Sequence, residues 1–154
     1  MKRTIVLAGL VAAVLISGEP ASAASNEADA RALFTAFIVA QNAHDISAVK
    51  SMLWKSPETL LYSRGIEARG TEAVAQRFAE YYHGTWQLKP DMTKFEISTI
   101  SDNVVQILVP IVFMRGLPGA KPRSNTFLIS QTYVKGDNGW RVAVILPIAN
   151  TQLK

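Results

Sequence analysis

Hydrophobic positions follow a helical spacing before Gly84 and a strand alternation after Trp86. Between about residues 26 and 54, apolar side chains recur three and four positions apart, which is the spacing of one helical face. They predict two helices, one built on Leu33, Phe34, Phe37, Ile38 and Gln41 and one on Ile46, Val49, Met52 and Leu53. We expect Asn26 to cap the first and Asp45 the second, because their side chains can accept from free N–H groups at a helix start.

A third helix is predicted to end near Gly84, with Val74, Phe78, Tyr81 and Tyr82 on one face. It follows a short β-favouring run at 59–63 and a turn and cap at 69–71. Strands are predicted at 94–100, 104–114, 124–134 and 140–148. A turn at 102–103, a loop at 116–122 and a turn at 136–139 join them.

The order of these elements predicts the fold class. Helices first and strands last favour an α+β fold, with three N-terminal helices on one face of a curved, mainly antiparallel sheet. The 104–114 strand is apolar on both faces, which predicts burial on both sides. Pro110 within it predicts a bulge or an edge, because proline cannot donate to a sheet ladder. A fold of this kind encloses a pocket and points to ligand binding or small-molecule chemistry.

The N-terminus has the pattern of a cleaved secretory leader. Lys2 and Arg3 precede an apolar run of 12 residues at 5–16, and small residues follow at 21–23. The run is shorter than the roughly 20 residues of a membrane span, so we prefer cleavage to a membrane anchor. We therefore predict a signal peptide at 1–23 and one domain at 24–154. The domain is expected in the periplasm or outside the cell, with no membrane contact after cleavage.

Composition narrows the possible chemistry. The absence of cysteine excludes disulfides, thiol catalysis and cysteine-ligated metals. The net charge is +4, but the basic residues are scattered, and no basic stripe with interleaved aromatics predicts nucleic-acid binding. The densest basic group is Arg115, Lys121 and Arg123 at the 116–122 loop. This group could contact an anionic surface, but we interpret it as a solvated hairpin tip.

Three short motifs carry a resemblance to a known family. They are Asn42-Ala43-His44-Asp45 between the first two helices, Arg69-Gly70-Thr71-Glu72-Ala73-Val74 at the third helix, and Asn138-Gly139-Trp140-Arg141-Val142 at the last strand. In their order and spacing, from about Ala28 to Ala149, the chain resembles the nuclear transport factor 2-like superfamily, in its SnoaL-like branch. The resemblance implies a cone-shaped α+β fold with a pocket between helices and sheet, often dimeric through the sheet.

The resemblance does not decide function. Members include ketosteroid isomerases, dehydratases, polyketide cyclases and many proteins without known activity. The isomerases use a carboxylate base near the end of the first strand, where this chain has no acid before Glu67. Many relatives carry histidine on the last strand, where this chain has Val144 and Leu146. Whether the chain is an enzyme is therefore left open.

The catalytic candidates that remain are Tyr62, Glu67 and His83. Glu67 is better interpreted as a solvated acid and His83 as a half-exposed helix end. His44 beside Asp45 could form a catalytic pair, but we prefer a helix-end histidine next to a helix cap. No acid and histidine cluster predicts a metal site, and no sequence fingerprint predicts a cofactor.

Ligand-binding candidates are the aromatic and amide side chains expected near the pocket. They are Phe37, Gln41, Tyr62, Tyr82, Trp86 and Gln131. Each could instead be an ordinary core residue, but Gln131 is a single amide in an apolar row, and a buried amide must find partners.

Three hypotheses follow. The preferred one is a non-catalytic domain that binds a small apolar or amphipathic molecule. The alternatives are an isomerase, cyclase or dehydratase acting on a small hydrophobic substrate, and a module that assembles through its sheet. A homodimer is expected in any of these cases.

Overall fold

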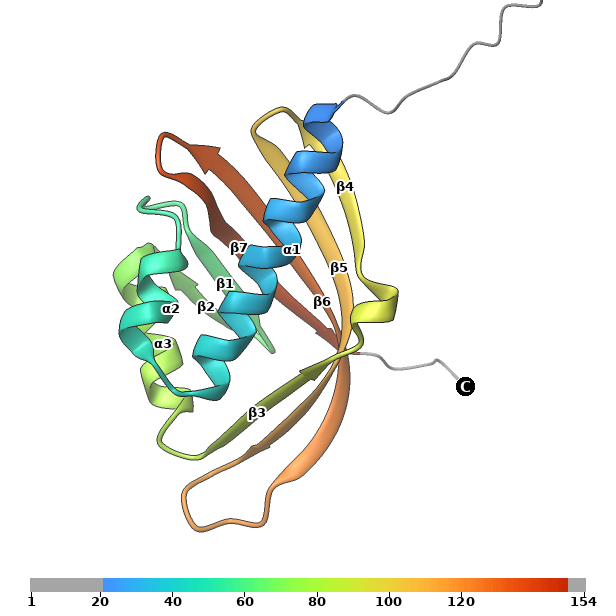
Figure 1. Ribbon diagram of the computed structural model, residues 1–154. Coiled ribbons are helices and arrows are strands. Elements are labelled where there is room, and N and C mark those ends of the chain that lie inside the picture. Colours follow the sequence, from blue (N-terminus) through green and yellow to red (C-terminus); the bar gives the residue numbers. More distant parts are fainter. Residues whose placement is uncertain (1–20, 150–154) are drawn as a thin grey trace, which may run out of the picture.

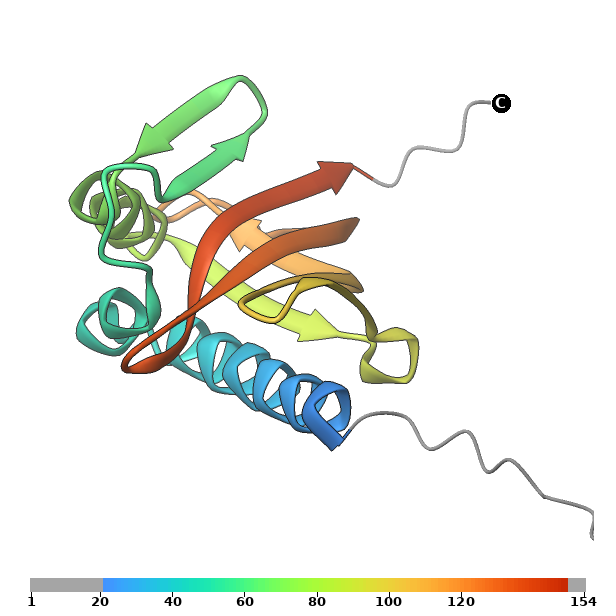
Figure 2. The same ribbon diagram turned by 90° about the horizontal axis from the view of Figure 1, so that it is seen from above.

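The computed structural model describes residues 21–149, with side chains from Ser25 onward. The predicted leader lies outside the described residues except at its end. The helices are α1 (Ala21–Asn42), α2 (Ile46–Met52) and α3 (Thr71–Tyr81), which confirms the three predicted helices. Figure 1 shows them on the concave side of a curved sheet, and Figure 2 shows the same arrangement from above, with α1 running beside the sheet.

One sheet contains all seven strands. The strands are β1 (Leu60–Ser63), β2 (Ile66–Arg69), β3 (Thr85–Pro90), β4 (Glu96–Ser101), β5 (Val104–Gly116), β6 (Arg123–Gly136) and β7 (Gly139–Ala149). Their order is β2-β1-β7-β6-β5-β3, and β4 also pairs with β5. All pairs are antiparallel except β1 with β7. The predicted α+β cone with a mainly antiparallel sheet is therefore confirmed.

Two strands, β2 and β3, were not assigned from the sequence. The turn between β1 and β2 consists of Arg64 (φ 54°) and Gly65 (φ 81°), both left-handed, as a tight hairpin requires. Glycine accepts this conformation without cost, whereas an arginine does not. The hairpin therefore carries some backbone strain at Arg64.

Strands β3 and β4 share one edge of β5 end to end. β4 pairs as far as Leu108 and β3 from Ile111, so Pro110 lies between them. The Asp91 N–H donates to the Pro110 carbonyl at 2.8 Å. The backbone of Pro110 thus faces the gap, where β5 needs no ladder donor. The predicted bulge is absent, because β5 and β6 pair through Pro110 without a shift in register. The predicted edge is confirmed locally, because Pro110 faces the gap between β3 and β4.

The helix starts differ in part from the predictions. Asp45 caps α2 as expected, its Oδ1 accepting from the Ala48 N–H at 2.9 Å. Asn26 does not cap α1, because the helix already begins at Ala21; its buried side chain accepts from Lys135 Nζ at 3.3 Å. The cap position of α3 is Gly70, which has no capping side chain.

The motif between α1 and α2 ties both helices to β3. Asn42 Nδ2 donates to the Leu88 carbonyl at 2.9 Å, and the Leu88 N–H donates to Asn42 Oδ1 at 2.8 Å. His44 Nε2 lies 3.0 Å from the Trp86 carbonyl. His44 is thus a helix-end residue that contacts β3, as we preferred over a catalytic pair with Asp45.

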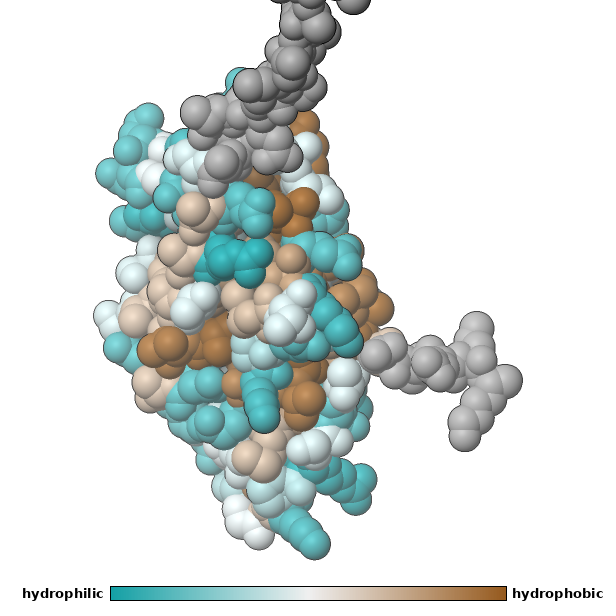
Figure 3. Space-filling view, turned by 45° about the vertical axis from the view of Figure 1, so that its right-hand side comes forward, coloured by the Kyte–Doolittle hydropathy of each residue, from teal (hydrophilic) through white to brown (hydrophobic). Residues whose placement is uncertain are grey.

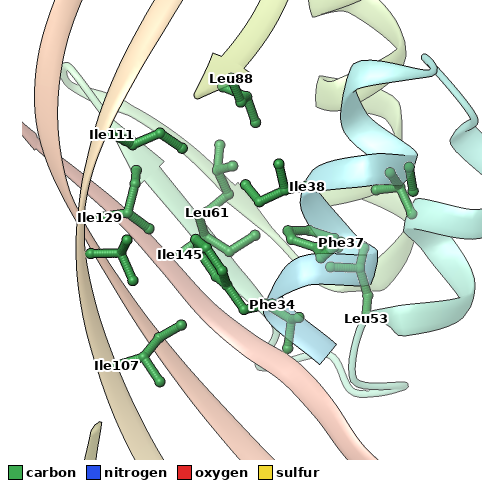
Figure 4. Close-up of a cluster of buried hydrophobic side chains, with 14 of the residues drawn as sticks. Phe34, Phe37, Ile38, Leu53, Leu61, Leu88, Ile107, Ile111, Ile129 and Ile145 are labelled. Atoms are coloured by element: carbon green, nitrogen blue, oxygen red, sulfur yellow. The ribbon is translucent and has the colours of Figure 1, made fainter. Parts of the chain in front are cut away.

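The core lies between α1 and the sheet. Figure 4 shows Phe34, Phe37 and Ile38 of α1 turned toward isoleucines of β5, β6 and β7. Phe34 and Phe37 are fully buried, and burying such a side chain contributes about 1.5–3 kcal/mol. This layer fixes the distance between α1 and the concave face.

The outer, convex face of the sheet carries hydrophobic side chains that are partly exposed to solvent. On β5 the inward residues are buried, but Val112 and Met114 are 38% and 42% exposed, and Ile148 of β7 is 48% exposed. The prediction that β5 is buried on both sides is therefore wrong for these outward positions. Hydrophobic surface lies along the right-hand side of Figure 3, toward this outer face.

Candidate functional site

A pocket lies inside the cone, between the helices and the concave face of the sheet. Its cavity volume is about 40 Å³. On the same measure, one ordered water needs roughly 10–15 Å³. The lining consists of Ile38, Gln41, Leu61, Ser63, Phe78, Tyr81, Trp86, Leu88, Ile111, Phe113, Arg115, Phe127, Ile129, Gln131, Ile145 and Pro147. The pocket is therefore narrow and mostly apolar, with a few polar groups, as is usual for small-molecule sites.

The apolar walls come from elements far apart in the chain. Ile38 of α1 faces Ile111 of β5 and Ile129 of β6 across the interior, as Figure 4 shows. On the sheet, Ile111 is in register with Phe127 and Ile129 with Val109, so β5 and β6 place their inward side chains side by side. The walls thus belong to rigid helix and strand positions rather than to loops.

An aromatic group forms the end of the pocket near α3. The rings of Tyr81 and Trp86 are stacked, with centroids 4.7 Å apart and an interplanar angle of 5°. Phe113 meets Trp86 edge to face at 5.4 Å. The buried Trp86 Nε1 has no hydrogen-bond partner among the described residues. This N–H is thus a donor still unpaired in the pocket wall.

Gln131 supplies a polar group in the pocket wall. The Tyr133 hydroxyl donates to Gln131 Oε1 at 2.8 Å, and both residues are buried. This bond orients the amide within the pocket wall. Gln41 of α1 lines the same pocket and is 4% exposed. Two amides therefore stand where they can bond a ligand.

The structure brings together Gln41, Trp86 and Gln131 from the predicted ligand-binding residues. The other three lie outside the lining. Phe37 is turned into the core against Phe78, at 5.8 Å. Tyr62 alternates with the inward Leu61 and is 46% exposed.

Tyr82, the third of these residues, lies outside the pocket lining and packs against the segment that follows α1. Its ring stacks on His44 at 4.7 Å and 3°. Its buried hydroxyl has no partner among the residues that the structure describes. Burial raises the pKa of Tyr82 well above its ordinary value, so the phenol stays neutral.

The catalytic candidates are not gathered in the pocket. Glu67 lies on β2, where it accepts from Arg69 Nε at 2.8 Å. His83 is exposed after the end of α3. Tyr62 is turned outward, as described above. The structure therefore assembles no acid–base pair from these residues.

The ionisable groups of the lining are Tyr81 and Arg115. Burial raises the pKa of Tyr81, although the positive charges of Arg77, Arg115 and Arg64 oppose this shift. A neutral phenol and a guanidinium both donate hydrogen bonds at neutral pH. Among residues 25–149, no carboxylate or histidine belongs to the lining. The pocket as it stands can donate hydrogen bonds but holds no general base.

Sequence reasoning missed Tyr81 and Arg115 as pocket residues. Arg115 was assigned to a solvated loop group, yet it is in register with Trp86 on β3. The signal was present in the alternation of β5, since inward positions recur every second residue up to Phe113 and then Arg115.

Among the described residues, neither a metal site nor a membrane-spanning helix is present. Within 21–149, no three histidine or acidic side chains lie close enough to hold a metal ion. No helix in that range is both long and apolar enough to cross a membrane.

Known structures share this architecture. A nuclear transport factor 2-like protein from Salmonella enterica superposes with a TM-score of 0.71 at 17% identity, over 86% of this chain and 96% of that one. An uncharacterised cystatin-like-fold protein from Caulobacter vibrioides gives 0.71 at 14% identity, over 82% and 91%. The fold is that of the nuclear transport factor 2-like proteins.

A third neighbour with this fold is provisionally named a dehydratase of the NTF2-like family. It comes from Streptomyces avermitilis and gives a TM-score of 0.66 at 11% identity, over 84% of this chain and 99% of that one. No protein-family model and no curated protein matches the chain. At these identities the NTF2-like likeness establishes the fold, which hosts both binding proteins and enzymes, and the function must be argued from the pocket.

Proposed function

We propose that the protein binds a small apolar or amphipathic molecule in the pocket between its helices and sheet, without catalysing a reaction on it. The observation that carries this proposal is the lining itself, which combines apolar walls with Gln41 and Gln131 and holds no carboxylate or histidine among the described residues. The two amides would orient a ligand, and the apolar walls would supply most of its affinity. The NTF2-like fold is compatible with this role.

The main alternative is an isomerase, cyclase or dehydratase acting on a small hydrophobic substrate. Such an enzyme would need a positioned base within hydrogen-bond reach of its substrate. Tyr62, Glu67 and His83 lie outside the lining, so each would have to act from outside the pocket. Ligand binding therefore needs only the residues that already line the pocket, whereas catalysis would need a base brought in from outside it.

A neutral fluorescent dye, phenylnaphthylamine, tests the binding proposal. We expect saturable binding with one site per chain. Ile129→Trp should fill the pocket and weaken dye binding by about tenfold or more, because the ligand loses its contacts there. Ile38→Trp, from the opposite wall, provides a second blocking variant in case the first does not fold.

Ile66→Trp is the matched control, since Ile66 is 41% exposed on β2 and lies outside the lining. Equal dye binding by wild type, both blocking variants and the control would refute the pocket as the site. Absence of any saturable dye binding to the folded wild type would refute the proposed function itself.

We further propose that the domain acts in the periplasm or outside the cell. Support comes from Lys2, Arg3, the apolar run at 5–16 and the small residues at 21–23. Intact-mass measurement of the protein recovered from the envelope or medium should give a chain that begins at or near Ala24. A full-length chain confined to the cytoplasm would contradict this location.

The expected homodimer is also a proposal. It is supported by the outward apolar residues Val112, Met114 and Ile148, since such surface is normally covered when it forms a patch. A second copy can cover it with the same surface, as twofold interfaces do.

A further inference from the structure

The pocket opens into a basic hollow at the free end of the β5–β6 hairpin. This outer hollow is lined by Arg64, Glu80, Tyr81, Gly84, Thr85, Trp86, Arg115, Gly116, Leu117, Pro118, Arg123 and Asn125. It shares Tyr81, Trp86 and Arg115 with the inner pocket, so the two spaces adjoin. An apolar interior thus meets an entrance that contains three arginines.

None of these three arginines forms an ion pair with an acidic side chain in the described part of the chain. The ion pairs of the described residues use other basic side chains, and the one acid of the outer hollow, Glu80, pairs with Arg77 at 2.6 Å. Arg115 is half-buried, and its guanidinium lies 5.4 Å from the centre of the Phe127 ring. Burial lowers the pKa of Arg115, and the nearby charge of Arg64 adds to the shift.

The positive charges of this group repel one another. Arg115 and Arg123 are directly paired across β5 and β6, and like charges in that position destabilise a sheet. Arg64 adds a third charge from a left-handed turn position that disfavours any side chain. An anion bound among the three groups would relieve this repulsion.

We propose that the ligand is an amphipathic anion, whose carboxylate is held at the entrance by Arg115, Arg64 and Arg123 while its slender apolar body enters the pocket. The proposal rests on the proposed function and specifies its ligand class. A guanidinium presents paired N–H donors that match a carboxylate, and the neutral Tyr81 phenol can add another donor. The narrow interior suits a single alkyl chain or one flat ring system, such as the naphthyl group of the dye, and the adjoining outer hollow leaves room for the rest of the molecule.

Matched eight-carbon probes test this ligand class. Octanoate, octanol and octylamine share one tail and differ in the charge of the head group. We expect octanoate to displace phenylnaphthylamine about tenfold more effectively than octanol, because charge-assisted hydrogen bonds are added to the same apolar burial. Octylamine should bind more weakly than octanol. Octanol binding as tightly as octanoate would overturn the anion proposal but leave the proposed function standing.

Variants locate the head-group site. Arg115→Gln should remove most of the preference for octanoate over octanol, whereas Arg115→Lys should keep part of it. Lys55→Gln removes the same charge from an exposed residue in a separate surface hollow and should leave the preference unchanged. Equal loss in Arg115→Gln and Lys55→Gln would show a general charge effect and refute the site.

Arg64→Gly separates ligand binding from stability. Glycine relieves the left-handed strain and the charge repulsion, so the melting temperature should rise by about 3 °C. Octanoate affinity should fall in the same variant because one guanidinium is lost. A variant that gains stability without losing octanoate affinity would contradict a role for Arg64 in holding the anion.

Discussion

The Tyr133–Gln131 hydrogen bond should contribute unequally to stability when it is broken from its two ends. Tyr133 is 0% exposed and lies in the core, whereas Gln131 lines the pocket. Gln131→Met leaves the Tyr133 hydroxyl without a partner where water cannot enter, which should cost about 2–3 kcal/mol of unfolding free energy. Tyr133→Phe leaves the Gln131 amide beside a space that admits water, so its cost should be about 1 kcal/mol.

A double-mutant cycle measured by urea unfolding isolates the bond. The double variant Tyr133→Phe/Gln131→Met removes both polar partners and should be less destabilised than the sum of the singles, by about 1 kcal/mol or more. With a slope of about 1–3 kcal/mol per molar urea, Gln131→Met alone should lower the unfolding midpoint by roughly 1 M. Additivity within about 0.5 kcal/mol, or a larger cost for Tyr133→Phe than for Gln131→Met, would refute the reasoning.

Three further predictions concern packing, pH and assembly. Gly84→Ala should lower the unfolding free energy by about 1–3 kcal/mol, because the new Cβ would collide with the Gly116 carbonyl oxygen; Gly136→Ala, which meets no neighbouring atom, is the control in the same urea series. Burial holds the pKa of Tyr133 well above its ordinary value of 10.0. Above about pH 10 the unfolded chain therefore binds fewer protons than the folded one, so stability should be constant near neutral pH and fall as the pH rises further. Tyr133→Phe should make the loss of stability with rising pH less steep, and an unchanged slope in this variant would contradict the role given to Tyr133. Val112→Lys on the outer sheet face should convert the proposed dimer to a monomer in light scattering, and a wild type already monomeric at high concentration would rule out the dimer.

Local patterns in the sequence were sufficient to predict most of the fold. The helical face of α1 and the alternation of β5 and β6 depend on neighbours within a few residues, so periodicity reveals them. Asp45 was found as a cap for the same reason, because its bond to Ala48 is local. Strand β2 was missed because it is four residues long and lies at the sheet edge, with only Ala68 buried.

The site was harder to predict because its parts meet through tertiary contacts. Gln131 stood out as an amide in an apolar row, and the structure places it in the pocket lining. Arg115 was read as a loop residue, because its neighbours at 116–122 are rich in glycine and proline. Its inward direction follows from the length of β5, which continues to Gly116 and so extends the alternation past Phe113. Asn42 gave no local signal, since its partner Leu88 is 46 residues away.

The attachment of Asn42 to Leu88 also affects how the protein meets other copies of itself. An open sheet has free edges that can recruit further strands, which is a common route to aggregation. Asn42 occupies the outward N–H and C=O of Leu88, the groups that a foreign strand would need to pair with β3. The edge at β2 is short and carries the charged pair Glu67 and Arg69. Asn42, at the end of α1, therefore protects the longer edge at β3 from pairing with another strand. Loss of the Asn42 side chain should appear first as a tendency to aggregate.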